Sequence, residues 1–456
     1  MGALPTIRFM REYRLRLAQL ALENMPFPLH QARVVLDLHA ADGASTQALQ
    51  YRMPYSSVLG VGSETPAASV GRCGERYLRE LPPKFRCDCV VALLEPHQPL
   101  TPTLEVIDSL ETRWAVVVAP YSTAQSVEWS HRGYQTHYEI TEEPNDGVIV
   151  LGLRDSEAQA ILTATPRVLV ISPVRQKPAI LAHFLEGLRR LDTTGMEVGF
   201  LFIDNNDEPR SSNMLLEFTR QVSVPVHRIR LPVGEPYHRT ESHHCWTESL
   251  YWRLAAIKDG ALEVAQRQGY DYAFLVDSDL VLHPQTLQRM VACRREVLSQ
   301  VFWTAWSDDK PPLPNVWYGD SYNLYRVRRH QSLEREQQAR RTEAFLSALA
   351  FYPGVYRVGG LGACTLIARR AIEAGVSFGE LRGLIQQGED RHFCARAESL
   401  GLRLFADTTL PALHLYRESE LPRVEKYWRL VEAGLQGVEL NREMFHLLLG
   451  KQLSVA

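Results

Sequence analysis

The chain has 456 residues, more than one hydrophobic core usually organises, so we expect two domains. Apolar residues make up 45% and charged residues 23% of the sequence, which excludes a mainly disordered or fibrous protein. The formal net charge of -3 at pH 7 gives no indication of a polyanion-binding protein.

Apolar runs alternate with helical periodicity along most of the chain, which predicts an α/β protein with a mostly parallel sheet. In the first block the expected strands are residues 34–38, 57–61, 89–94 and 114–118. The block closes with a predicted hairpin, 138–140 and 148–150, joined through turn residues 144–147. We place this first domain at residues 1–160.

The first strand of this block runs directly into a polar loop, with the sequence Val34-Val35-Leu36-Asp37-Leu38-His39-Ala40-Ala41-Asp42-Gly43. It resembles the first strand and loop of class I S-adenosylmethionine-dependent methyltransferases, and Glu64 matches their ribose-binding acid. The resemblance covers about residues 30–152 and implies a Rossmann-like fold. The family has glycines where His39 and Ala41 stand, because the backbone there passes close to the cofactor. We therefore predict a degenerate methyltransferase-like domain serving in assembly or acceptor recognition, with S-adenosylmethionine a doubtful cofactor and true methyl transfer the alternative.

A second block, predicted to span residues 161–456 with a helical tail, opens a new series of strands. The main ones are 167–171, 198–203 and 272–276. Each of these apolar runs ends abruptly in polar or acidic residues. Ligands of open α/β sheets bind beyond the carboxyl ends of the strands, so these strand ends predict a binding site.

Two strand ends supply candidate residues for binding a nucleotide. Ser172, Pro173 and Arg175 follow the first strand, where free backbone amides and a guanidinium can meet a base, ribose or phosphate. Asp204 ends the second strand, and its carboxylate can accept from a ribose hydroxyl or a base N–H. An ordinary turn rich in Asx residues is the alternative for Asp204.

The strongest signal is a pair of carboxylates, Asp277 and Asp279, directly after a buried strand. A diphosphate carries closely spaced negative charge, so a protein must offer cations or hold a metal that bridges carboxylate and phosphate oxygens. Two aspartates at a strand end favour the second solution, with Mn²⁺ or Mg²⁺ as the ion. Capping of a helix that begins near Pro284 is the alternative.

Two later motifs contain glycines and acids. Gly360 and Gly362 precede an apolar run, where glycine lets a substrate approach the backbone or permits positive φ, and we place them on the acceptor side. Glu389 and Asp390 precede a helical run. A carboxylate there can remove the proton of an attacking hydroxyl, although helix N-termini also favour acids for their dipole.

Two further candidates lie near the metal and the phosphates. His414 stands between apolar residues, and it is either a metal ligand or a satisfied core histidine. The segment 237–246 contains several histidines, but their spacing fits no standard zinc site. We expect this segment to form a loop over the nucleotide, with Arg239 near phosphate.

In their order and spacing these motifs resemble the glycosyltransferases of the A-type fold, in particular the inverting, family 2-like enzymes. The resemblance covers roughly residues 165–417. It implies that Asp204 contacts the nucleoside of the donor and that His414 lies beside the second aspartate of the metal motif. It also implies that Asp390 acts as general base, with Glu389 as the fallback.

We therefore predict a metal-dependent glycosyltransferase of the hexosyltransferase class, which moves a sugar from a nucleoside diphosphate sugar to an acceptor hydroxyl with inversion. One alternative is retaining transfer, because residues 172–175 also resemble fungal mannan mannosyltransferases. Another is a non-catalytic scaffold of two enzyme-like domains. The acceptor class stays open between glycan, protein, lipid-linked and nucleic-acid acceptors.

The sequence also predicts a cytoplasmic location. No stretch approaches the roughly 20 apolar residues of a transmembrane segment. Residues 1–16 lack the apolar core of a signal peptide.

Overall fold

The computed structural model divides the chain into two compact units, Met1–Thr163 and Ala164–Ala456. In the second unit it describes residues 165–235, 237, 245–306, 311–319, 321–327, 331–385 and 388–449. In the first unit it describes residues 14–15, 17–18, 21–22, 32–38, 40, 43–54, 56–61, 76–78, 80–81, 85–94, 98, 100–119, 134–135, 138–139 and 148–154. Among all these residues, no helix is both long and apolar enough to cross a membrane.

The first unit contains a parallel sheet with the strand order β3-β2-β1-β4-β5. These strands are β1 (Val34–Leu38), β2 (Ser57–Val61), β3 (Arg76–Leu78), β4 (Arg86–Leu93) and β5 (Glu111–Ala119). Strand β8 (Val148–Arg154) runs antiparallel beside β5, and the short β6 (Tyr134–Gln135) and β7 (Tyr138–Glu139) pair with β8. The sheet confirms the expected α/β class, and the expected pairing of 138–140 with 148–150 is confirmed for residues 138 and 139, whereas residue 140 lies outside the described residues.

Both faces of this sheet are buried, which explains its almost uninterrupted apolar strands. Val35 of β1 belongs to one core cluster and Leu36 to the cluster on the other face. Helix α2 (Ala44–Arg52) contributes Leu49 to the first cluster, and α3 (Leu100–Ser109) contributes Leu104 to the second. Helix α2 therefore packs on one face and α3 on the other.

The second unit contains a mixed sheet with the strand order β11-β10-β9-β12-β19-β14-β20-β17. These strands are β9 (Arg167–Val174), β10 (Glu197–Asp204), β11 (Val226–Arg230), β12 (Tyr272–Val276), β14 (Val297–Thr304), β17 (Val355–Val358), β19 (Cys364–Ala368) and β20 (Leu404–His414). The first four are parallel to one another, and β19 runs antiparallel between β12 and β14. The carboxyl ends of β9, β10 and β12 therefore meet at one edge.

Short strands extend this sheet. They are β13 (Leu280–Val281), which pairs with the end of β20, and β15 (Leu313–Pro314), which pairs with β14. Strands β16 (Val316–Trp317) and β18 (Gly360–Leu361) pair with each other as a separate two-stranded sheet. The core between sheet and helices is rich in Phe, Leu and Val side chains, with Phe184, Phe202 and Phe274 fully buried.

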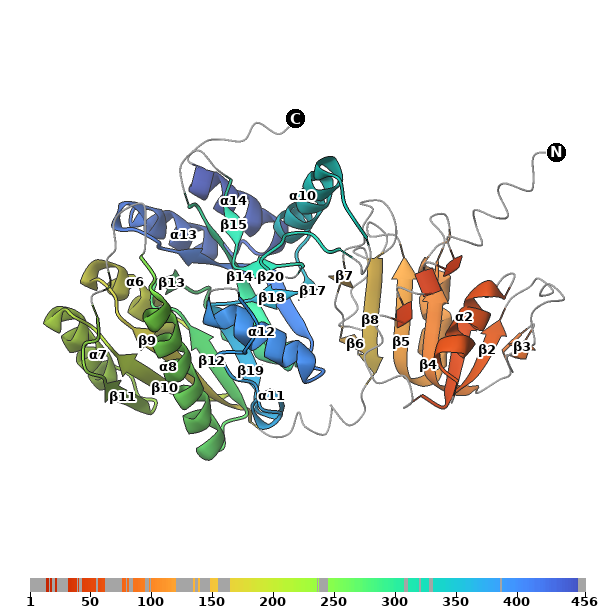
Figure 1. Ribbon diagram of the computed structural model, residues 1–456, viewed down its shortest axis with the longest axis horizontal. Helices are drawn as coiled ribbons and strands as arrows, with labels where there is room; N and C mark the ends of the chain where they lie inside the picture. Colours follow the sequence, from red (N-terminus) through yellow and green to blue (C-terminus); the bar gives the residue numbers. More distant parts are fainter. Residues whose placement is uncertain are drawn as a thin grey trace. The chain divides into compact units, whose positions relative to one another are not determined.

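Helices cover the sheet of the second unit. They are α6 (Pro178–Arg189), α7 (Pro209–Gln221), α8 (Glu248–Arg267), α9 (Thr286–Ala292), α10 (Arg335–Phe351), α11 (Arg369–Glu373) and α12 (Glu389–Ser399). Proline begins α6 and α7, where its missing N–H removes no helical hydrogen bond. Helices α8 and α12 lie side by side over the sheet (Figure 1).

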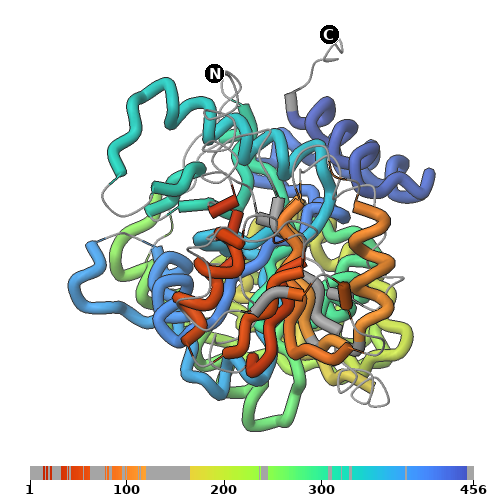
Figure 2. The backbone as a smooth tube through the Cα atoms, turned by 90° about the vertical axis from the view of Figure 1, so that its right-hand side faces the viewer, coloured from red at the N-terminus to blue at the C-terminus, as the bar shows by residue number. Residues whose placement is uncertain are grey.

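The chain continues into α13 (Arg423–Glu432) and α14 (Gly437–Leu449), after a 3-10 turn at Glu418–Glu420. These two helices pack against each other, as the dark blue tube of Figure 2 shows. Their buried side chains Tyr427, Leu440 and Met444 form one cluster with Leu413 of β20. This packing fixes the strand that ends at His414.

Candidate functional site

A pocket of about 240 Å³ opens at the carboxyl ends of β9, β10 and β12. Asp277, Ser278, Asp279 and His414 line it. The other lining residues are Pro173, Val174, Arg175, Gln176, Asn205, Tyr237, Trp246, Leu250, Arg253, Leu254, Ile257 and Tyr416. The structure therefore brings the predicted metal residues together with Pro173 and Arg175 at a single pocket.

Asp277, just after β12, is hydrogen-bonded through its backbone to Ala363, a residue with an unusual backbone conformation. Its N–H donates to the carbonyl oxygen of Ala363 at 3.0 Å. Ala363 has a φ of 63°, in the left-handed region that costs a non-glycine residue about 1–3 kcal/mol. Burial raises the pKa of Asp277, while Lys258 lowers it and Asp279 raises it further. A cation in the pocket would favour the ionised form of Asp277.

Asp279 and His414 face each other. The pairing of β13 with β20 sets His414 opposite Leu280, so His414 Nε2 lies 3.5 Å from Asp279 Oδ2. On the other side of the ring, Nδ1 is 2.9 Å from the hydroxyl oxygen of Thr304, which fixes the ring orientation. Burial opposes protonation of His414, but the charge and hydrogen bond of Asp279, together with the charges of Glu420 and Asp277, outweigh burial and raise the pKa of the imidazole.

The fit of this pair to a metal ion follows from its chemistry. Within the part of the chain that the structure describes, no group of three or more His, Cys, Asp or Glu side chains is arranged to hold a metal. A Mg²⁺-type ion, however, is commonly held by one or two carboxylates together with substrate phosphates. Asp279 and His414, with Asp277 beside them, therefore fit an ion that is shared with a bound diphosphate.

A buried ion cluster lies at the start of α12. Lys258 Nζ donates to Glu389 Oε1 at 2.7 Å and to Asp390 Oδ1 at 3.0 Å. The side chains of Lys258, Glu389 and Asp390 are 4%, 8% and 26% exposed. Burial raises the pKa of Asp390, and Lys258 opposes that effect. The two acids were predicted from the sequence, whereas Lys258 was missed because it is distant in sequence and lies within the long helix α8.

Gly360 and Gly362 were expected to let a substrate approach the backbone. Side chains of the protein occupy the space beside both glycines. A Cβ on Gly360 would lie 1.9 Å from the indole of Trp317, and one on Gly362 would lie 2.2 Å from Asp390 Oδ2. Neither glycine has a positive φ. Close packing therefore explains both glycines, and Gly362 is the residue against which Asp390 rests.

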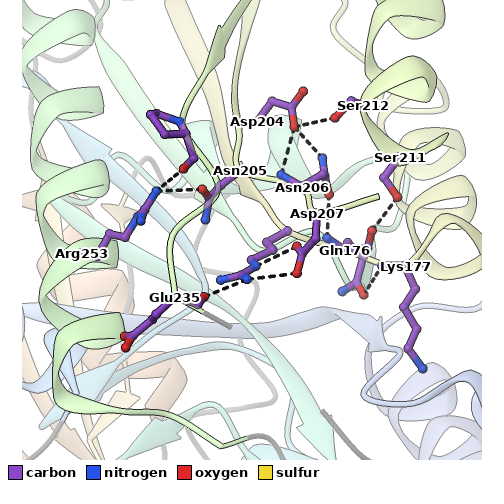
Figure 3. A network of polar contacts seen from close by, with 12 residues as sticks. Gln176, Lys177, Asp204, Asn205, Asn206, Asp207, Ser211, Ser212, Glu235 and Arg253 are labelled. Atoms are coloured by element: carbon purple, nitrogen blue, oxygen red, sulfur yellow. Dashed lines mark hydrogen bonds and ion pairs between the residues drawn. The ribbon is translucent and has the colours of Figure 1, made fainter. Parts of the chain in front are cut away.

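Asp204 ends β10 but faces a buried network instead of the pocket (Figure 3). Its side chain is fully buried, and Oδ2 accepts from Arg228 Nε and Nη2 at 2.8 and 2.6 Å. The other oxygen, Oδ1, accepts from Asn206, Ser212 and Arg230. Burial alone would raise the pKa of Asp204, but hydrogen bonds from Asn206 and Arg228 hold it below its usual range. Asp204 therefore anchors the turn whose Asn205 lines the pocket, and Asp204 itself is not among the lining residues.

Replacement of Asp204 by asparagine is expected to lower the free energy of unfolding by about 1–3 kcal/mol, because Arg228 and Arg230 lose their anion. Urea unfolding at pH 7 measures this effect. Asp207→Asn is the matched control: Asp207 pairs with Arg175 but is 47% exposed, so a change below about 1 kcal/mol is expected. Equal losses in the two variants would contradict the anchoring role of Asp204.

Of the other predicted donor-binding residues, some line the pocket and others do not. Arg175 lines the pocket, but its Nε and Nη2 donate to both carboxylate oxygens of Asp207 at 2.8 and 3.0 Å. Ser172 is fully buried within β9 and does not line the pocket, whereas its neighbour Pro173 does. Arg239 lies outside the described residues.

The pocket lining includes two aromatic side chains, Tyr237 and Trp246, from the ends of the segment 237–246 that was expected to form a loop over the nucleotide. The Trp246 ring is 5.0 Å from Tyr237 and stacks on Tyr251 at 5.3 Å, and Trp246 is 40% exposed. Beside them, Arg253 Nη2 donates to Asn205 Oδ1 at 3.0 Å. Exposed aromatic rings offer flat surfaces on which a nucleobase can stack.

Comparisons with known proteins find similarity to glycosyltransferase family 25 over part of the chain. Residues 165–346 match the model described as Glycosyltransferase family 25, N-terminal domain. A Glycosyltransferase 25 family member of Aedes aegypti is 22% identical over 183 residues, which are 39% of this chain and 29% of that protein. A Probable inactive glycosyltransferase 25 family member 3 of Bos taurus is 26% identical over 179 residues, 38% of this chain and 29% of that protein. The chain thus spans less than a third of these relatives.

Among solved structures, S. aureus TarS 1-349 aligns with a TM-score of 0.35 at 13% identity, covering 62% of this chain and 70% of that one. The family match begins after the first unit and ends at residue 346, so it includes Asp277 and Asp279 but stops before Asp390 and His414. The motifs resembled family 2-like enzymes, whereas the matching family model is that of family 25. The second unit is therefore similar over residues 165–346 to the N-terminal domain of glycosyltransferase family 25.

Proposed function

We propose that the second unit transfers a sugar from a nucleoside diphosphate sugar to an acceptor hydroxyl in a metal-dependent reaction. One observation carries this proposal: the pocket at the carboxyl ends of the parallel strands is lined by Asp277, Asp279 and His414. The similarity to glycosyltransferase family 25 supports the reaction class.

The base and the diphosphate of the donor match different groups of residues in the pocket. Trp246 and Tyr237 offer ring faces to the base, and Asn205 offers an amide. At the other end Asp277, Asp279 and His414 would hold a Mn²⁺ or Mg²⁺ ion, which neutralises the negative charge of a departing diphosphate. Arg175 is paired with Asp207, so it contributes to the shape of the pocket wall but adds no net positive charge there.

The acceptor hydroxyl meets Asp390 in this proposal. Its oxygen attacks the anomeric carbon and forms the new glycosidic bond, while the nucleoside diphosphate leaves with the electrons of the broken bond. The hydroxyl proton passes to the carboxylate of Asp390. A single displacement of this kind inverts the anomeric configuration.

A screen of sugar nucleotides with and without Mn²⁺ tests the proposal. Release of nucleoside diphosphate from one donor, dependent on the metal and faster with an acceptor, is the expected result. Asp279→Ala serves as the negative control for release by contaminants. No metal-dependent release from any donor would contradict the proposed activity.

A non-catalytic scaffold is the second candidate. The Bos taurus relative is named as probably inactive, and Lys258 occupies an oxygen of both candidate base residues. A scaffold would bind a nucleotide, if at all, without releasing product. Donor binding without turnover in the same screen would favour it.

For the first unit we propose a degenerate methyltransferase-like domain that serves in assembly or acceptor recognition. The strand order β3-β2-β1-β4-β5 supports a doubly wound fold. Oδ2 of Asp37, near the end of β1, accepts from the hydroxyls of Ser45 and Thr46 at 2.7 Å each. This acid is therefore engaged by the protein itself. His39 and Ala41 lie outside the described residues.

Titration calorimetry with S-adenosylmethionine is expected to detect no binding at millimolar concentration, because His39 and Ala41 replace glycines that the cofactor needs. If crowding by these side chains is the cause, the double replacement His39→Gly and Ala41→Gly should make binding measurable. Micromolar affinity of the unchanged chain would contradict the degenerate assignment and make the protein bifunctional.

A further inference from the structure

Lys258 is a buried cation in a group of carboxylates. It lies in the interior of α8, one residue after Ile257, which lines the pocket. Its Nζ contacts Glu389 and Asp390 at 2.7 and 3.0 Å and lies 4.9 Å from the centre of the Phe378 ring. Only 4% of the Lys258 side chain is exposed, so contacts within the protein take the place of water around its ammonium group.

The charges around Lys258 explain why it stays ionised. Burial disfavours its ammonium group, but Asp390, Glu389 and Asp277 outweigh burial and raise the pKa of Lys258. The same acids act on Tyr322, whose phenol pKa is raised by burial and by Asp390 and Glu389. The surrounding acids therefore favour the protonated, positively charged form of Lys258.

The two oxygens of Asp390 have different surroundings. Oδ1 accepts from Lys258 at 3.0 Å, and Oδ2 occupies the space beside Gly362 that a Cβ would fill. With one oxygen held by the lysine and the other against a glycine, the carboxylate has little freedom to rotate. Oδ2 is then the oxygen left to receive a proton.

We propose that Lys258 is a positioning residue for the reaction: it holds Asp390 through Oδ1, so that ionised Oδ2 faces the acceptor hydroxyl. This inference rests on the proposed function of the second unit, with Asp390 as base. The groups that face Asp390 are Lys258 from α8, Asp277 from the end of β12, Tyr322, and Glu389 and Cys394 of its own helix.

The first test is the pH dependence of kcat/KM for Lys258→Met. Without the ammonium group, buried Asp390 loses its nearby positive charge, and the rise of activity with pH should move upward by about one to three pH units. Lys258→Arg keeps the charge and should restore the position of the rise, although the larger guanidinium lowers the rate. Circular dichroism and thermal melting establish that each variant is folded.

Arg289→Met is the matched control. Arg289 Nε donates to the fully buried Asp407 at 2.8 Å, so this variant also removes the cation of a buried carboxylate, outside the pocket lining. It should lower stability and leave the pH profile in place. A uniform loss of rate in Lys258→Met with an unmoved profile would overturn the positioning role.

Glu389→Gln gives a second test that does not require Lys258→Met to fold. It removes a negative charge beside Asp390 and leaves Lys258 paired with Asp390 alone. The pKa of Asp390 should therefore fall, and the rise of activity with pH should move to lower pH. Complete loss of activity in this variant would assign the base to Glu389 and overturn the inference. An unchanged chain that transfers no sugar would overturn the proposed function, and with it this role, whereas an active chain with unmoved profiles overturns the role alone.

Discussion

Replacement of Asp279 by alanine is expected to abolish manganese-dependent donor binding and sugar transfer while leaving the fold intact. Asp279 Oδ2 lies 3.5 Å from His414 Nε2 in the pocket, so the variant removes the carboxylate from the proposed ion site. Loss of a direct ligand should exceed the about 10- to 100-fold effect typical of residues that only support a metal ligand. Titration calorimetry of the donor with and without Mn²⁺ measures it.

Asp271→Ala is the matched control for this experiment. Asp271 stands at the other end of β12, where its carboxylate accepts from the Arg167 backbone at 2.9 Å and pairs with Arg369 at 3.3 Å. This variant should lose stability and keep its metal-dependent affinity. Unchanged donor affinity in Asp279→Ala would rule out the metal assignment.

Replacement of Asp390 by asparagine is expected to lower turnover by about 10²- to 10⁴-fold, the usual contribution of a positioned general base. The amide keeps the size of the side chain and therefore its contact with Gly362. Donor affinity should survive, because Asp390 does not line the pocket. Steady-state kinetics together with donor titration separate the two quantities.

Two outcomes would contradict the assignment of Asp390. A loss of donor affinity with intact turnover would place Asp390 among the nucleotide ligands. Product in which the donor's anomeric configuration is retained would exclude a single displacement assisted by this base. That second result, read by proton NMR of the new glycosidic bond, would favour the mannosyltransferase-like alternative.

The strands and the metal motif were predictable because their information is local. A strand buried on both faces reads as a continuous apolar run, as in Tyr272–Val276, and the carboxyl ends of parallel strands mark a ligand site. Those two rules place Asp277 and Asp279 at the pocket. His414 required the family resemblance, because only the pairing of β13 with β20 brings it beside Asp279.

The residues that the sequence did not indicate act through contacts between distant segments. Lys258 and Asp390 are 132 positions apart and meet only because α8 and α12 pack together. The true neighbours of Asp204 are arginines of β11, and no pattern within Asp204–Asp207 indicates that Arg228 and Arg230 neutralise it. Buried charge pairing is decided by packing, and a single sequence carries no direct record of it.

Glycines around the acids also have consequences for how this site can change. The missing side chains of Gly360, Gly362 and Gly388 leave the space taken by Trp317, Asp390 and the hydroxyl of Tyr322. A substitution at Gly360 or Gly362 is therefore conditional on its partner: alanine at position 360 becomes tolerable only after Trp317 has become smaller. Gly388 differs, because its φ of 103° strains any other residue whatever the size of Tyr322. The Gly360–Trp317 and Gly362–Asp390 pairs should show strong epistasis, because the large side chain must become smaller before the glycine can be replaced.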